Sequence, residues 1–145
     1  GQAQLDWLQQ KLDEQPPGIK KPVFVFFHYP LPNTLEGTKR HPYILQHRKF
    51  KKILDRHPEV IFFSGHTHRS LRHTKQRHDD RFLMLGSSSV MRHQESLYVE
   101  VYDDDVNIFS RDHRAREWIQ NRFYRHPLVT ESHISQNTKV LLKAK

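Results

Sequence analysis

The stretch Val60-Ile-Phe-Phe-Ser-Gly-His-Thr-His68 joins a short apolar run to two histidines that are one residue apart. Its β-branched and aromatic residues are typical of a buried strand. Gly65 can adopt a positive φ and turn the chain sharply just beyond that strand. We therefore expect a strand near residues 59–64 whose end carries His66 and His68 into one cleft.

A second apolar run, Pro22-Val-Phe-Val-Phe-Phe-His-Tyr-Pro30, also ends in a histidine, His28. Pro30 has no backbone N–H and therefore prevents the strand from continuing. In open α/β sheets, ligand sites lie beyond the carboxyl ends of the strands. If the two strands run parallel, His28, His66 and His68 converge on one shared site.

The rest of the chain alternates helical and strand patterns, which is typical of a layered α/β fold. Leu5, Leu8 and Leu12 recur at helical spacing, and a second amphipathic helix is expected at residues 43–56, with Pro42 at its start. Further strands are expected at 81–86, 97–102 and 106–110, the last two as an antiparallel hairpin. The polar residues 69–80 predict a solvated loop, and Trp118, Ile119 and Phe123 predict a short helix.

Two motifs in the first half resemble those of the calcineurin-like metallophosphoesterases, namely His28-Tyr29-Pro30 and Gly65-His66-Thr67-His68. The amphipathic helix before them also matches the family. The resemblance implies the C-terminal half of a layered α/β/β/α sandwich with a C-terminal β-hairpin and short helix. Residues 1–126 would form this half domain, and 127–145 a C-terminal tail.

The family motifs that precede these two are absent from the sequence. They comprise an Asp-x-His pair, an Asp that bridges two metals, and a Gly-Asn-His-Asp/Glu segment with the catalytic histidine. The chain also begins at Gly1 rather than at a methionine. We expect this polypeptide to be the C-terminal half of a larger enzyme, inactive by itself.

The resemblance also implies a chemistry, in which His28 and His66 bind one metal and His68 binds the other. The complete enzyme would hold two divalent ions, of manganese, iron or zinc, which suit imidazole ligands. Such a site hydrolyses phosphoester bonds, and the similarity favours the cyclic-nucleotide phosphodiesterase-like branch, with cyclic nucleotides as candidate substrates. Because the bridging carboxylate is missing, we expect metal binding by this chain alone to be weak or absent.

The formal net charge of +8 and the sequence pI of about 9.9 raise the question of nucleic acid. The basic residues are scattered without an aromatic-interleaved motif, so nucleic acid is an unfavoured partner, and attraction of an anionic phosphoester is the simpler explanation. There are no cysteines, which excludes disulfides and thiolate metal sites. The longest apolar run is too short to span a bilayer. The location stays open, with the cytoplasm favoured.

Several alternatives remain. The chain could be a non-catalytic basic module for binding or assembly, and an uncovered sheet edge could pair with a second copy. The segment 86–89, Gly-Ser-Ser-Ser, is expected to be a plain turn, with phosphate contact as the alternative. The three aspartates at 103–105 are likewise expected to form a turn rather than a calcium site. Most other histidines lie in polar segments and are expected to be solvated; these are His41, His47, His73, His78, His93, His113, His126 and His133.

Overall fold

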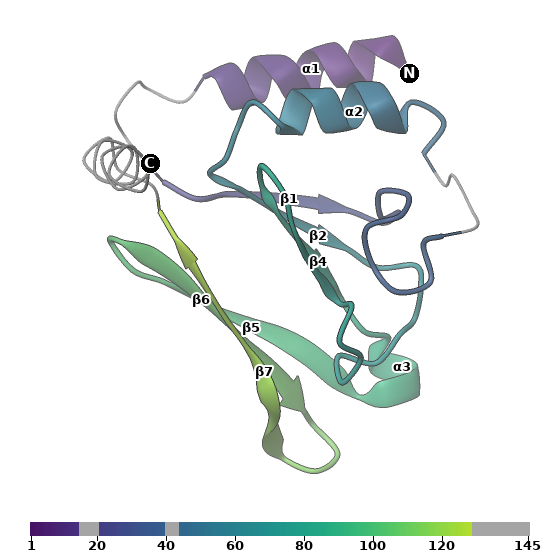
Figure 1. Cartoon of the computed structure of the whole chain (residues 1–145), viewed down its shortest axis with the longest axis vertical. Helices are drawn as coiled ribbons and strands as arrows, with labels where there is room; N and C mark the ends of the chain where they lie inside the picture. Colours follow the sequence, from purple (N-terminus) through teal and green to yellow (C-terminus); the bar gives the residue numbers. More distant parts are fainter. Residues whose placement is uncertain (15–20, 40–43, 129–145) are drawn as a thin grey trace, which may run out of the picture.

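The structure, a computed structural model, describes residues 1–14, 21–39 and 44–128 of the chain. Within them the fold is mixed α/β, with two sheets and few helices (Figure 1). The first sheet contains β1 (Val23–Phe27), β2 (Val60–Ser64), β3 (Arg77–Asp79) and β4 (Leu83–Gly86), in the order β1-β2-β4-β3. The second contains β5 (Glu95–Val101), β6 (Asp105–Asp112) and β7 (Glu117–Pro127), in that order.

Within the first sheet, β1, β2 and β4 run parallel to one another. Phe27 of β1 lies opposite Ser64 of β2, and Ser64 lies opposite Gly86 of β4, so the three carboxyl ends share one edge. The short strand β3 is antiparallel to β4. This arrangement confirms the parallel pairing on which the shared histidine site depends.

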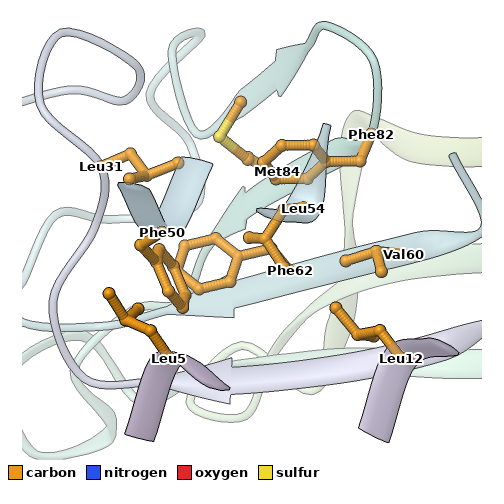
Figure 2. Close-up of a cluster of buried hydrophobic side chains, with 9 residues drawn as sticks. All are labelled: Leu5, Leu12, Leu31, Phe50, Leu54, Val60, Phe62, Phe82 and Met84. Carbon is orange, nitrogen blue, oxygen red and sulfur yellow. The ribbon is translucent and has the colours of Figure 1, made fainter. Parts of the chain in front are cut away.

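Two helices cover one face of this sheet (Figure 1). They are α1 (Gln2–Asp13) and α2 (His47–Leu54), which lie side by side. Figure 2 shows the cluster between helices and sheet, which comprises Leu5, Leu12, Leu31, Phe50, Leu54, Val60, Phe62, Phe82 and Met84. Burying one such large side chain stabilises the fold by roughly 1.5–3 kcal/mol.

The second sheet packs against the opposite face of the first. This cluster joins Ile61, Phe63, Leu83 and Leu85 to Val106, Ile108 and Leu128. Alternate residues of β2 therefore serve the two faces, as the alternation of side chains along a strand requires. Coverage of both faces explains why β2 is apolar almost throughout and buried at every position.

The expected strands agree with the structure to within about two residues, and the hairpin of β5 and β6 is confirmed. The short helix expected around Trp118–Phe123 is wrong, because this segment forms β7. The rings of Trp118 and Phe123 pack on Phe109 of β6, with centroid distances of 5.5 and 4.9 Å. Cross-strand aromatic packing outweighs the weak helical spacing there.

Other differences are smaller. The second helix begins at His47 rather than near residue 43, and the helix start expected at Pro42 lies outside the described residues, as do Pro16-Pro17-Gly18. The segment 69–80 is not simply a solvated loop, because it contains β3 and buries Leu71 and Gln76. A four-residue helix, α3 (Val90–His93), follows the serine-rich turn. Strand β7 reaches Pro127, and residues 129–145 lie outside the described part.

Candidate metal centre

Three parallel strands deliver the candidate residues to one edge of the first sheet. The backbone N–H of Gly65 donates to the carbonyl oxygen of His28 at 3.1 Å, which extends the pairing of β1 and β2 by one residue. The N–H of Ser87 donates to the carbonyl oxygen of Ser64 at 2.7 Å, and its hydroxyl donates to the same oxygen at 2.9 Å. The ends of β1, β2 and β4 are therefore tied together where the histidines begin.

The side chains of His28 and His66 meet at this edge. Nε2 of His28 lies 3.2 Å from Nδ1 of His66, and the rings are nearly perpendicular, with centroids 5.1 Å apart and an interplanar angle of 85°. The ring of Tyr29 lies 4.6 Å from that of His66 and 5.0 Å from that of His28, so it borders both. His28 is exposed and His66 half-buried. The pair is thus accessible to a ligand from solvent.

The separation of these two nitrogens fits one metal ion. Two imidazole nitrogens bound to a tetrahedral zinc at about 2.0–2.1 Å lie about 3.3 Å apart. The observed 3.2 Å between His28 and His66 is close to this value. The same distance also suits a hydrogen bond from one ring to the other, which a neutral pair of suitable tautomers can make. The distance between the two nitrogens is therefore compatible with a shared metal ion as well as with a hydrogen bond.

His66 lies at the centre of a tight turn. Its φ is 65°, and the N–H of Thr67 donates to the carbonyl oxygen of Gly65 at 2.7 Å. A hydrogen bond over two residues around a central residue of positive φ is the mark of a rare, strained γ-turn. The expectation that Gly65 supplies the positive φ is wrong, because the left-handed residues are His66 and His68. The chain turns on the histidine itself.

His68 is placed differently from the other two. It is exposed and left-handed, with a φ of 52°, and its carbonyl oxygen lies 3.0 Å from Nε2 of His93. In the part of the chain that the structure describes, no three or more His, Cys, Asp or Glu side chains form a group able to hold a metal ion. The structure therefore brings together His28 and His66, while His68 does not complete a three-ligand group with them.

The serine-rich turn beside the site has structural contacts of its own. Ser87 bonds to the end of β2 as described, and the hydroxyl of Ser89 accepts from the N–H of Arg92 at 3.4 Å, which caps α3. These contacts support the reading of 86–89 as a turn that starts a short helix. Contact of this turn with phosphate stays an alternative.

Some of the basic residues form ion pairs with acidic neighbours. Arg72 lies 2.9 Å from Asp112 and 3.3 Å from Glu117, while hydrogen bonds from the N–H of Ala115 and from Arg72 lower the pKa of Asp112. Nε of Arg125 donates to the buried Asp105 at 2.6 Å. Part of the positive charge is therefore offset locally, and Asp105 is engaged by an arginine.

Sequence reasoning missed Glu95 and Arg122, which bind the backbone just after the histidine pair. A glutamate at the start of a strand is expected at the surface, and no periodic pattern in the sequence indicates that Glu95 is buried. His126 was expected to be solvated but is half-buried, and this burial lowers its pKa. The contacts and the burial of these three side chains can be recognised only when the position of the second sheet against the first is known.

Comparisons of the chain with protein-family models, with curated proteins and with solved structures found no match. None of the helices in the described ranges combines the length and the apolar character needed to cross a membrane. The resemblance to a phosphoesterase family accordingly rests on the sequence alone, on the two histidine motifs and the amphipathic helix before them.

Proposed function

We propose that this chain is the C-terminal part of a dinuclear metal-dependent phosphoesterase and supplies His28 and His66 to one of its metal ions. The observation that carries the proposal is the 3.2 Å separation of His28 Nε2 and His66 Nδ1 at the carboxyl ends of adjacent parallel strands. This spacing is close to that of two ligands on one ion, and both residues lie at the carboxyl ends of parallel strands, where ligand sites of open α/β sheets are found. His68 is proposed to face the second ion, and the layered phosphoesterase sandwich is the proposed parent fold.

The residues of this chain have defined tasks in the proposed site. Neutral imidazoles of His28 and His66 bind through Nε2 and Nδ1, and the turn at His66 fixes the direction of its ring. Tyr29 borders both rings and limits the space available to a substrate. A bound divalent ion supplies Lewis-acid polarisation of a phosphoryl oxygen and a lowered pKa for a coordinated water. Two histidines are an incomplete ligand set, so further ligands must come from elsewhere.

Zinc or manganese titration tests this proposal. We expect weak binding of the metal ion. Calorimetry and the shifts of the imidazole nitrogen NMR signals of His28 and His66 measure it. His28→Ala and His66→Ala should each abolish it, whereas His73→Ala, at an exposed position on the following segment, should leave it unchanged. Binding that survives both substitutions at the pair would contradict the proposed site. Tight binding of two ions per chain would show that the chain supplies more ligands than proposed.

A second candidate function is a non-catalytic assembly module that pairs with a second copy. In the described residues β1 pairs only with β2, so its other edge presents free backbone groups. A groove of about 850 Å³ runs beside it, and its lining includes the exposed Trp7, Phe26, Phe27 and Leu45. At roughly 200 Å² for each large side chain, these four expose about 500 Å² together. A two-fold dimer would bury about 1,000 Å² from them alone, near the lower limit for a specific interface.

Sedimentation velocity measures the oligomeric state and so tests this second candidate function. Phe26, which is 74 % exposed, should be central to such a dimer, and Phe26→Lys should yield a monomer. Met91→Lys on α3 changes a side chain that is 92 % exposed and does not line the groove, and it should leave the dimer intact. A monomeric wild-type chain at high concentration would reject the assembly module and leave the metal site unaffected.

A further inference from the structure

One buried carboxylate of the second sheet binds the segment that follows His68. Glu95, at the start of β5, is only 3 % exposed. Its Oε1 accepts from the hydroxyl of Ser70 at 2.7 Å, and its Oε2 accepts from the backbone N–H of Leu71 at 2.7 Å. Both oxygens are thus engaged by residues that lie two and three positions beyond His68. A buried carboxylate with two such bonds fixes the position of that backbone.

Two further side chains bind the same segment from other elements. Arg122 of β7 donates through Nε to the carbonyl oxygen of Leu71 at 3.0 Å and through Nη2 to that of Arg72 at 2.6 Å. His93 of α3 lies within 3.0 Å of the carbonyl oxygen of His68. The backbone from residue 68 to 72 is therefore held at several points by β5, β7 and α3.

These bonds lie at the end of the strained part of the chain and just beyond it. His66 and His68 both have left-handed φ values, 65° and 52°. Residues other than glycine adopt such values at a cost in energy. Strained backbone persists where the surrounding structure over-determines it, and it concentrates at functional sites. Upstream, the bond from Gly65 to the carbonyl oxygen of His28 holds the turn; downstream, the bonds to Glu95 do so.

We propose that Glu95 is a positioning residue for the metal site, which keeps His66 within reach of His28 by fixing the backbone at Ser70 and Leu71. This proposal rests on the proposed function. Glutamate suits the task because both of its oxygens accept hydrogen bonds. A glutamine presents one oxygen and one NH₂ group, so it keeps both contacts only if the Ser70 hydroxyl turns to accept from that NH₂ group, although this hydroxyl already accepts from the N–H of Arg72 at 3.1 Å.

The test compares Glu95→Gln with Glu117→Gln. Glu117 is an exposed glutamate of the same sheet that also contacts Arg72 but makes no bond to residue 70 or 71, so it is a matched control. For Glu95→Gln we expect zinc affinity at the histidine pair to fall by about tenfold, the lower end of the range for a residue that orients a ligand. The backbone carbon shifts of His66 and His68 should move away from their left-handed values. Glu117→Gln should change neither property.

The two readouts separate the proposals. Unchanged zinc affinity and unchanged carbon shifts in folded Glu95→Gln would overturn the positioning role. If the wild-type chain binds no zinc, the metal site proposed for the isolated chain fails, and the carbon shifts still decide whether Glu95 sets the turn. If Glu95→Gln does not fold, Ser70→Ala removes one of the two bonds and should shift both readouts in the same direction by less; no shift would again overturn the role.

Discussion

A Cβ atom added to Gly86 would lie 2.5 Å from Oε1 of Gln76. Gln76 is buried, and its Nε2 donates to the carbonyl oxygens of Arg69 and Ser70 at 3.1 and 3.4 Å. Its side chain therefore cannot withdraw without losing these bonds. The missing side chain at the end of β4 allows the segment after the histidines to lie close to the sheet.

The first prediction compares two glycines at neighbouring strand ends. Gly86→Ala should lower the free energy of unfolding by about 1–3 kcal/mol, as overpacking does. Gly65→Ala should change it by less than about 0.5 kcal/mol, because the nearest atoms to its added Cβ are at 3.6–3.9 Å and its φ is not positive. Urea unfolding of both variants measures the difference. Equal costs would contradict the close approach at Gly86.

The second prediction concerns the left-handed backbone at His68. Glycine removes the Cβ penalty of a positive φ but adds chain entropy to the unfolded state, so His68→Gly should raise the free energy of unfolding by about 0.5 kcal/mol. His73→Gly, at an exposed position without a positive φ, should lower it instead. Thermal or urea unfolding distinguishes the two signs. A loss of stability in His68→Gly would mean that its side chain makes contacts that outweigh the strain.

The third prediction is a pH dependence of stability. Burial lowers the pKa of His126 below its ordinary value of about 6.5. The unfolded chain then binds more protons, so the stability from neutral His126 is fully present above about pH 6.5 and is lost as the pH falls through the folded-state pKa. The slope for one such group is at most about 1.4 kcal/mol per pH unit. Acidification from pH 7.5 should therefore destabilise wild type more than His126→Phe, and parallel losses in urea unfolding would reject this origin.

The fourth prediction concerns turnover. This chain alone should not hydrolyse bis-p-nitrophenyl phosphate or cyclic AMP with manganese, whereas a version extended upstream should, because losses of groups that act together are strongly non-additive. Parallel assays of the two polypeptides measure this. Metal-dependent turnover by the chain alone that vanishes in His66→Ala would contradict its inactivity. Turnover by neither polypeptide would favour the assembly module.

The positions of β1 and β2 could be predicted because residues 23–27 and 60–64 are apolar runs in a polar chain. For β2 this composition follows from its coverage on both faces, whereas Phe26 and Phe27 of β1 are exposed. The parallel order of the two strands was a condition of the shared site, which the structure confirms. The meeting of His28 and His66 followed from one further rule, that parallel strands end at a common edge. A weaker pattern gave a wrong prediction, the short helix at the position of β7. The aromatic residues of β7 contact neighbours on another strand, and local spacing does not reveal such contacts.

The details of the site could not be predicted for a different reason. The positive φ at His66 occurs just before a segment that is bound by Glu95 and Arg122, two residues distant in the sequence. Local preference alone assigns such a conformation to the adjacent Gly65. Tertiary contacts that impose strain on a histidine leave no trace in the sequence of the turn itself.

The strand registers have a consequence for the order of folding. In the second sheet, Val101 pairs with Val106 and Asp112 pairs with Glu117 across short turns. In the first sheet, β1 and β2 pair across a long connection that contains α2. Because loop closure must precede long-range pairing, we expect the meander of β5 to β7 to form early and the parallel pairing late. Substitutions at the histidine pair should then speed unfolding while leaving the folding rate nearly unchanged.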